Sequence, residues 1–199
     1  MRLKRTLIFI LVFCLIGTVT VFAADAYERL GIPVKVVVNG ETLKESGVLV
    51  DNTTLLPLRA VANQLRAVVD WDQASKTVNI YKPNVHITLV QNLKGGVLGT
   101  FGNVPKGKIN FKIFTQIEGL MVPVDKIKFT IEDPYGKTVY TYEYTLQQKS
   151  EKDFWVFTPG ISLNFEHLGT YKVNVFMKLK DANNGEYFLV AEKQIRSIK

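Results

Sequence analysis

The second half of the chain alternates apolar and polar residues in short runs, and this alternation constrains its fold more than any other feature. Side chains along a β-strand point to opposite faces in turn, so each run from Ile109 onward has one apolar face to bury. Turn sequences such as DPYG and HLG separate the runs. About seven short strands with regular turns predict an antiparallel sandwich. The expected strands are INFKIFTQI, KIKFTIE, KTVYTYEY, DFWVF, ISLNF, TYKVNVFMKL and EYFLVAEKQI.

A smaller mixed unit precedes this half. Within VKVVVNGETL, Asn39-Gly40 follows alternating valines and predicts a hairpin, since Asn-Gly favours the tight turn that joins two strands. Pro57 is expected at the first position of a helix, where its missing N–H costs nothing. Two strands, VVDW and TVNIY, follow around the polar turn DQASK. The apolar stripe of the helix is formed by Leu58, Val61, Ala62 and Leu65.

These patterns predict a small α+β module, an antiparallel sheet plus one helix, followed by an all-β immunoglobulin-like sandwich. We assign the module to residues 34–82 and the sandwich to residues 108–199. Segment 83–107 between them contains prolines and several glycines and is expected to be a connector with one strand at HITLV.

The chain opens with the three-part layout of a secretory signal peptide. Arg2, Lys4 and Arg5 form a positive start, an apolar stretch runs from residue 7 to residue 22, and small residues follow. We expect residues 1–23 to be removed. The alternative is an uncleaved membrane anchor, the chain's only expected membrane contact, although the stretch is short for a spanning helix of roughly 20 residues. The protein is therefore expected to be extracytoplasmic, either secreted or associated with the cell surface.

Charge and cysteine content exclude several classes of function. Cys14 is the only cysteine and lies within the expected signal peptide, so the mature chain has no disulfide, no thiolate metal site and no cysteine nucleophile. The net charge of +7 includes the three positive charges of that segment, which leaves about +4. Such a diffuse charge does not predict nucleic-acid binding, which needs a clustered basic face.

Four stretches give residues 34–82 a resemblance to a known family. They are VNG at 38–40, LLPLRAVANQL at 55–65, VVDWD at 68–72 and KTVNI at 76–80. In this order and spacing they resemble the copper amine oxidase N-terminal-like domain, a stalk-type module of many exported Gram-positive proteins. The resemblance implies an α+β fold, an extracytoplasmic location and a non-catalytic role, with the copper of the name belonging to a separate catalytic part. Arg66 departs from the family pattern, which usually has glycine at the helix end.

The second half resembles immunoglobulin-like sandwiches in one further motif. In HLGTYKVNV, Tyr171 opens a strand after a glycine turn, as does the tyrosine of the tyrosine corner in those folds. The resemblance implies a structural role for Tyr171.

Three distinctive side chains of the module are interpreted as scaffold rather than as a ligand site. Arg59 and Arg66 would suit an anionic ligand, but we expect Arg59 to pair with a carboxylate such as Asp70 or Asp72 and to hold the helix on the hairpin. Trp71 would suit a sugar, but its place after two valines predicts burial. On this interpretation Trp71→Ala unfolds the module, because truncating a buried tryptophan costs about 3–5 kcal/mol. Arg66→Ala is expected to have little effect.

No pattern predicts an enzyme or a bound cofactor. Copper or zinc needs several imidazoles or thiolates that converge, and the mature chain has only His86 and His167, far apart in sequence. The sequence contains no GxSxG, no HExxH and no glycine-rich phosphate loop. We expect no metal, no cofactor and no catalytic residue, and a hydrolase is a distant alternative.

Aromatic residues are the candidate binding residues. Tyr140, Tyr142 and Tyr144 share one face of a strand, and Trp155 follows in the next strand. Exposed rings would stack on a glycan or a peptide, whereas buried rings would belong to the core, which the alternation with polar residues favours. A lysine set offers a similar choice between an anionic wall polymer and plain solvent; it comprises Lys106, Lys108, Lys112, Lys126 and Lys128.

Two functions follow from these observations. The first is a non-catalytic exported envelope or secreted module that binds or spaces other components, with a cell-wall polymer or another envelope protein as its partner. The alternative is a carbohydrate-binding module that uses the tyrosine row and Trp155. An exposed aromatic strip of several hundred Å² would favour the second, because soluble monomers rarely expose such a patch without a use.

We expect the secreted protein to begin at Ala24 or Tyr27, because the charged start, the apolar stretch and the small residues form a cleavable signal. Intact-mass analysis of material from the culture medium measures this directly. A full-length mass found in the membrane fraction would show that the segment is retained as an anchor.

Overall fold

The computed structural model describes residues 31–91, 102–146, 152–180 and 185–199. The expected signal peptide lies outside these residues. The described chain is mostly β, with one short α-helix, α3 (Leu58–Gln64). It divides into two compact units, and the boundary between Val61 and Ala62 lies inside this helix.

Short strands make up the first unit. The Asn39-Gly40 hairpin is confirmed: both residues have positive φ, 52° and 85°, as the tight turn requires. A second tight turn at Asp51 and Asn52, with φ of 45° and 62°, joins two further strands. The strands are β1 (Ile32–Val34), β4 (Gly47–Val50) and β5 (Thr53–Leu55), which form one antiparallel sheet, and the hairpin pair β2 (Val37–Val38) and β3 (Glu41–Thr42).

Helix α3 begins where the sequence predicts and is shorter than its apolar stripe. The carbonyl of Pro57 accepts the first helical hydrogen bond, from Val61 N at 3.0 Å. Of the four stripe residues only Ala62 is buried, and Leu58 and Leu65 are exposed. The prediction of one continuous apolar face is therefore wrong, because the helix ends after two turns, before Leu65.

Arg66 ends the helix in the conformation that glycine normally provides. Its φ is 58°, Ala67 N donates to Ala62 O at 2.8 Å, and Arg66 N donates to Asn63 O at 3.0 Å. These two bonds are the Schellman arrangement, in which the residue after the helix is left-handed. The arginine thus keeps the backbone geometry that glycine would allow at lower conformational cost.

The side chain of Arg66 is half-buried rather than fully solvated, while the expectation that Arg66→Ala has little effect stays a prediction. Its guanidinium is half-buried and donates to Glu192 Oε2 at 3.0 Å. These partners are 126 residues apart in the sequence, a separation that no local pattern reveals. The same helix end receives a second cation, because Lys82 Nζ donates to Leu65 O at 3.1 Å.

The hairpin that follows is formed by β6 (Val68–Asp72) and β7 (Thr77–Tyr81), which pair only with each other. The expected single small sheet of the module is therefore not formed. Asp72 closes the turn: its carboxylate accepts from Ala74 N at 2.8 Å and from the Ser75 hydroxyl. The Ser75 hydroxyl first, and then the backbone N–H groups of Ser75 and Ala74, hold the pKa of Asp72 below its usual value.

The prediction that Trp71 is buried is wrong. Its side chain is 41% exposed, and its Nε1 donates to Gln73 Oε1 at 2.7 Å. Because β6 and β7 form a separate two-stranded sheet, no third strand of the described residues pairs with this hairpin beside Trp71 and its cross-strand partner Val78. The expected unfolding by Trp71→Ala loses its basis.

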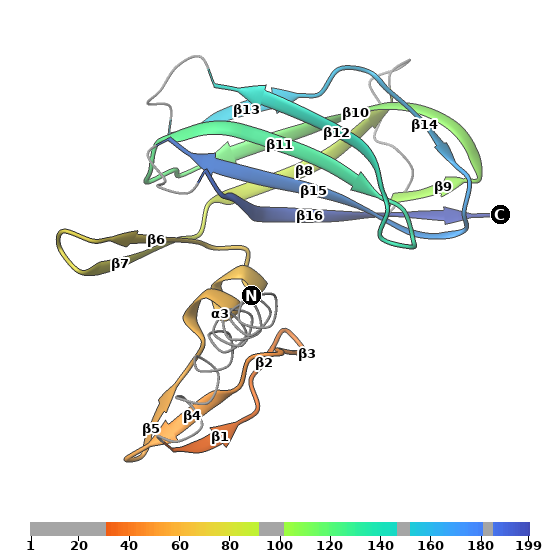
Figure 1. The fold of residues 1–199 in the computed structure, drawn as a ribbon. Coiled ribbons are helices and arrows are strands. Elements are labelled where there is room, and N and C mark those ends of the chain that lie inside the picture. The colour runs from red at the N-terminus through yellow and green to blue at the C-terminus, as the bar shows by residue number, and fades with distance from the viewer. Residues whose placement is uncertain (1–30, 92–101, 147–151, 181–184) are drawn as a thin grey trace, which may run out of the picture. The chain divides into compact units, whose positions relative to one another are not determined.

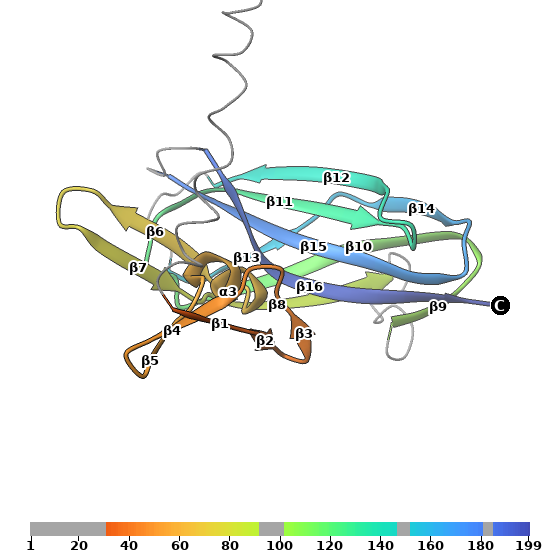
Figure 2. The same ribbon diagram turned by 60° about the horizontal axis from the view of Figure 1, so that its bottom comes forward.

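Two sheets form the larger part of the second unit, and Figures 1 and 2 show β12, β11, β15 and β16 side by side in one of them. All their strand pairs are antiparallel except that of β16 with β9, which is parallel. All seven strands predicted from the alternation are present. In the four-stranded sheet, β10 (Gly107–Glu118) pairs with β8 (Asn84–Gln91) on one side and with β13 (Phe154–Phe157) and then β14 (Ile161–Phe165) on the other. The five-stranded sheet has the order β12 (Thr138–Thr145), β11 (Val124–Glu132), β15 (Gly169–Leu179), β16 (Tyr187–Ile198) and β9 (Asn103–Pro105).

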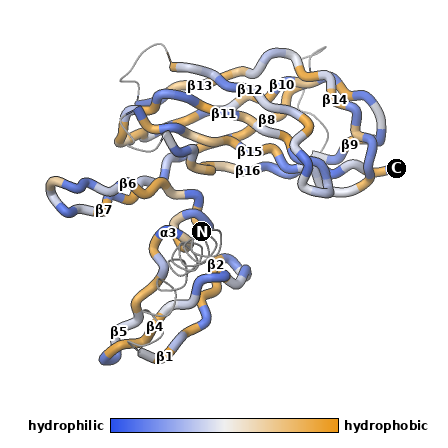
Figure 3. The backbone as a smooth tube through the Cα atoms, viewed as in Figure 1, coloured by the Kyte–Doolittle hydropathy of each residue, from blue (hydrophilic) through white to orange (hydrophobic). Residues whose placement is uncertain are grey.

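The two sheets share one apolar core. Phe111, Ile113 and Phe165 from the four-stranded sheet and Phe129 and Tyr171 from the five-stranded sheet are almost completely buried in it. Hydropathy alternates along the strands in Figure 3, as expected for sheets with one buried face. Strands β8 and β9 belong to these sheets, although the sequence places them in the expected connector.

Thr158 supplies the hydrogen bonds at an interruption in the four-stranded sheet. Strands β13 and β14 share one edge of β10 and leave a gap between them opposite Ile113. In this gap Ile113 N donates to Thr158 Oγ1 at 2.9 Å, and Thr158 N donates to Ile113 O at 3.0 Å. The buried Thr158 hydroxyl thus satisfies a backbone group for which no strand supplies a partner.

We expect Thr158→Val to lower the free energy of unfolding by about 1–3 kcal/mol, because it leaves the buried N–H of Ile113 unpaired. The matched control is Thr115→Val on β10, the strand of Ile113. Thr115 is fully buried, and its hydroxyl has no hydrogen-bond partner among the described residues. This control should be neutral or stabilising. Urea denaturation of both variants decides, and equal losses of stability would contradict the role assigned to Thr158.

Substitutions of Arg66 can separate the free-energy cost of its positive φ from the contribution of its ion pair with Glu192. Arg66→Gly and Arg66→Ala both lose the contact with Glu192, but only alanine retains the strain of a positive φ. We expect the glycine variant to be more stable than the alanine variant by about 1 kcal/mol. Glu192→Gln, which weakens the ion pair alone, should cost no more than about 1 kcal/mol. Equal stabilities of the alanine and glycine variants in urea would show that the helix end is not held left-handed.

Candidate functional site

The tyrosine row lies against the core rather than on the surface. Tyr140, Tyr142 and Tyr144 of β12 are half-buried and pack on the shared core, while the residues that alternate with them are exposed. The rings of Tyr142 and Phe129 are stacked, with centroids 6.1 Å apart. The row is therefore placed as a structural layer at the edge of the five-stranded sheet.

Tyr140 also belongs to the buried network around Thr158. Burial raises the pKa of the Tyr140 phenol, Tyr142 adds to the rise, and the hydrogen bond with the Thr158 hydroxyl partly offsets it. The Thr158 hydroxyl therefore serves both sheets, because it also accepts from Ile113 N. A ligand would have to displace this network to reach the phenol.

Trp155 occupies a different surface, the outer face of the four-stranded sheet. Along β13, Val156 points into the core, whereas Trp155 is 63% exposed and Phe157 is 44% exposed. Phe114 of β10 lies directly across from Phe157, with ring centroids 4.8 Å apart, and 6.3 Å from Trp155. We call Phe114, Trp155 and Phe157 the aromatic patch.

Sequence reasoning missed Phe114, although a signal for this residue was present. In INFKIFTQI, Phe114 shares its register with Lys112 and Gln116, the polar side of the strand. An aromatic ring in the polar register of a strand is exposed unless another layer covers it. The same test applied to FWVF separates Trp155 and Phe157 from the inward Val156.

The outer face continues along β10 as a polar surface. Asn110 lies opposite Ser162 of β14, and Lys108 lies opposite Asn164, which has an exposed amide. On the other side of β10, Thr88 of β8 lies opposite Phe114. The aromatic patch therefore occupies one end of a face whose other end carries amides, a hydroxyl and lysines.

The lysines of the two sheets differ in whether a described side chain interacts with their ammonium groups. On the five-stranded sheet, Lys126 Nζ lies 3.6 Å from Glu143 Oε2, and Lys128 Nζ lies over the ring of Tyr187 at 3.9 Å. On the outer face of the four-stranded sheet, Lys108 and Lys112 enter none of the ion pairs found between described residues. That face therefore has positive charge available for an anionic ligand.

Two acidic side chains lie along the outer face: Glu166 accepts from the Asn164 amide at 3.2 Å near Lys108, and Glu118 lies at the aromatic end. The carboxylate of Glu118 accepts hydrogen bonds from the side chains of Asn84, at 3.1 Å, and Gln116. This hydrogen bonding holds the Gln116 amide next to Trp155, its cross-strand neighbour. The side chain that borders the aromatic patch is therefore the Gln116 amide, and the Glu118 carboxylate is hydrogen-bonded to it and to Asn84.

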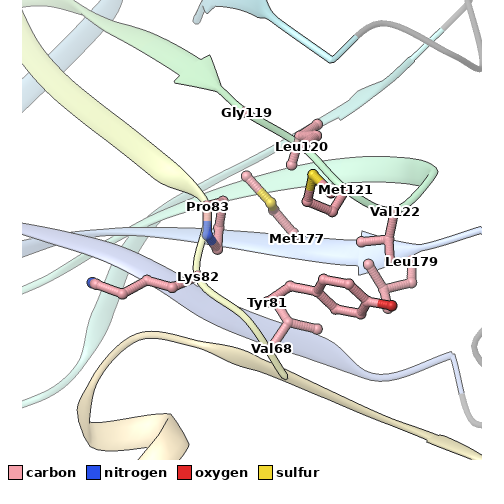
Figure 4. A pocket seen from close by; sticks show the side chains of 10 residues that line it. All are labelled: Val68, Tyr81, Lys82, Pro83, Gly119, Leu120, Met121, Val122, Met177 and Leu179. Carbon is pink, nitrogen blue, oxygen red and sulfur yellow. The ribbon is translucent and has the colours of Figure 1, made fainter. Parts of the chain in front are cut away.

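A small apolar cavity lies between the base of the β6–β7 hairpin and the β10–β11 connection (Figure 4). Val68 and Tyr81 line it from the hairpin, and Leu120, Met177 and Leu179 line it from the sheets. Its volume is about 20 Å³. A space of that size accommodates at most a single water, and apolar cavities of this kind are dry, so this cavity is a packing defect and not a ligand site.

A wider open groove, of about 700 Å³, lies at the end of the sandwich where β11 turns into β12. Tyr135 and His167 line it and meet edge to face, with centroids 5.0 Å apart. Asp133, which also lines it, accepts hydrogen bonds from Tyr135 N and Lys137 N at 2.9 Å and is thereby committed to its own turn. The second carboxylate of the groove, Glu166, accepts from the Asn164 amide at 3.2 Å.

Tyr171 and Arg59, for which the sequence predicts structural roles, lie on different units. The hydroxyl of Tyr171 accepts from His167 N at 3.1 Å, the contact that defines a tyrosine corner. Arg59 is exposed on the first unit, whereas Asp70 and Asp72 belong to the second, so the expected pairing stays a prediction.

Two absences concern the described part of the chain. No group of three or more His, Cys, Asp or Glu side chains converges there as a metal site would require. No helix of residues 31–91, 102–146, 152–180 and 185–199 is long and apolar enough to cross a membrane.

Comparisons with known proteins add a family for one segment. Two solved structures are similar to part of the chain: the CARDB domain of a Pyrococcus furiosus protein, in complex with di-metal ions, and an immunoglobulin-like protein from Pseudomonas aeruginosa. The first is 10% identical over 65% of this chain and 99% of that chain, with a TM-score of 0.34. The second is 16% identical over 67% and 98%, with a TM-score of 0.31. No curated protein sequence matches.

Residues 37–125 match the family described as the copper amine oxidase N-terminal domain. The match includes the motifs on which the resemblance was based and extends through β8 and β10 into the start of β11. The resemblance inferred from VNG, LLPLRAVANQL, VVDWD and KTVNI is thereby confirmed: this segment is similar to a copper amine oxidase N-terminal domain.

Proposed function

We propose that this protein is an exported, non-catalytic module that binds a component of the cell envelope through the aromatic patch. The similarity of residues 37–125 to a domain named for its place beside a catalytic part supports the non-catalytic role. The signal-like start of the sequence supports export and a cell-surface or secreted location.

The observation that carries the proposal is the exposure of Trp155 and Phe157 next to Phe114. Whole aromatic side chains present roughly 150–250 Å² each, so the exposed parts add up to roughly 250 Å². Solvated aromatic surface is costly, and three neighbouring rings concentrate it in one patch of the outer face, which makes this patch the candidate recognition surface.

The proposal includes an architecture. An α+β module at residues 34–82 precedes an immunoglobulin-like sandwich that comprises residues 108–199 and also strands β8 and β9 of segment 83–107. The resemblance of the first segment and the two sheets with their shared core support this order. In it the first module spaces the binding face from the envelope attachment or from a partner.

Carbohydrate binding is the second candidate and concerns the same surface. It is favoured by the amide and hydroxyl side chains that accompany the rings along β10, because such groups match the hydroxyls of a sugar. The tyrosine row, which the sequence placed in this site, belongs to the opposite sheet and faces the core.

Sedimentation with an insoluble cell-envelope fraction tests the proposal. The mature protein should co-sediment, and Trp155→Ala should abolish most of the binding, because a central aromatic anchor typically supplies more than tenfold in affinity. The matched control is Tyr135→Ala, which removes an aromatic ring that is 78% exposed elsewhere on the molecule. Equal binding of the parent protein and the Trp155→Ala variant would show that the patch is not the binding surface.

A further inference from the structure

Resting on the proposed binding function, we infer that the outer face of the four-stranded sheet binds a single chain of β-linked pyranose rings that carries carboxylates, such as the glycan strand of a cell wall. The rings of the chain stack on the aromatic patch, and its carboxylates pair with Lys108 and Lys112. The proposal commits to this one occupant for four reasons.

The first reason is the geometry of the rings. Phe114 and Phe157 are tilted by 41°, and Trp155 and Phe157 by 76°. Coplanar rings would suit the flat surface of a crystalline polymer, whereas these planes follow one another at an angle. A single chain, which can twist from one sugar to the next, meets such planes in succession.

The second reason is the polar chemistry along β10. Asn110 and Ser162 lie opposite each other on the same face as the patch, and Asn110 is exposed. An amide both donates and accepts hydrogen bonds, and a hydroxyl does the same. Sugar hydroxyls need partners of both kinds, whereas an aliphatic protein surface needs neither.

The third reason is charge. Lys112 lies in the same register as Phe114, one pleat along β10, and Lys108 lies two pleats further. Neither lysine has an ion-pair partner among the described residues, unlike Lys126 on the other sheet. A neutral glycan would leave both charges unused, and a chain with periodic carboxylates would meet them.

The fourth reason is size. From Lys108 to Gln116 the strand spans about 26 Å, at roughly 3.3 Å per residue, which accommodates several sugar rings in a row. The aromatic patch, with roughly 250 Å² exposed, lies at one end of this row. A narrow, long contact favours a linear polymer over a folded partner or a second copy.

Isothermal titration of the mature full-length protein with two matched probes tests the inference. The first probe is a peptide-free wall glycan strand of alternating N-acetylglucosamine and N-acetylmuramic acid, in which every second ring carries a carboxylate. The second is a chito-oligosaccharide of equal length, which has the same linkage and no carboxylate. We expect the acidic strand to bind about tenfold more tightly at low salt, and the difference to shrink in high salt because exposed charges are screened.

Variants separate the two contributions. Trp155→Ala should weaken binding of both probes by about tenfold or more. The double variant Lys108→Gln, Lys112→Gln should lower the affinity for the acidic strand to that of the neutral one and leave the neutral one unchanged. Tyr135→Ala should bind both probes like the parent, and the urea midpoint of each variant shows that it is folded.

Each contrary outcome has a separate meaning. If envelope sedimentation depends on Trp155 but neither soluble probe binds, the glycan assignment is overturned and the proposed function survives with a protein ligand. If neither the envelope nor the probes bind, both are overturned. Equal affinity for the two probes at low salt would overturn the carboxylate assignment, and tighter retention on crystalline chitin powder than on soluble chains would overturn the single-chain geometry.

Discussion

The pleat of β10 is the constraint on which the core and the candidate binding face both depend. Its inward residues, among them Phe111 and Ile113, are fully buried between the sheets, and the alternate positions carry Lys112 and Phe114 to the outer face. A shift of one residue in its register would exchange the two sets. Since β10 pairs with β8, β13 and β14, every strand of its sheet takes its register from it.

The sheets were predictable because their signals are local. Turn residues bound each run, and the alternation within a run assigns a buried and a solvated face without knowledge of the partner strand. The hairpin at Asn39-Gly40 belongs to the same class, since two residues determine its turn. The family resemblance was similarly readable, because its motifs lie in short contiguous stretches.

The features that the sequence did not predict depend on contacts between segments that are distant in the chain. Trp71 follows two buried valines and continues their strand, yet its exposure is set by whether another layer covers the hairpin. The partner of Arg66 is Glu192 on the last strand, and neither residue has a local signature for this pair. The candidate site was placed on Tyr140, Tyr142 and Tyr144 because period two shows that three rings share a face, and it does not show which face meets the core.

The exposure of both tryptophans has a consequence for spectroscopy. The chain has two tryptophans, and the indoles of Trp71 and Trp155 are both in contact with solvent. The fluorescence of the folded protein therefore comes from hydrated indoles, and its emission wavelength changes little when the chain unfolds. The buried chromophore is Tyr171, so near-ultraviolet circular dichroism of tyrosine follows the loss of the core, while tryptophan emission monitors the two surfaces.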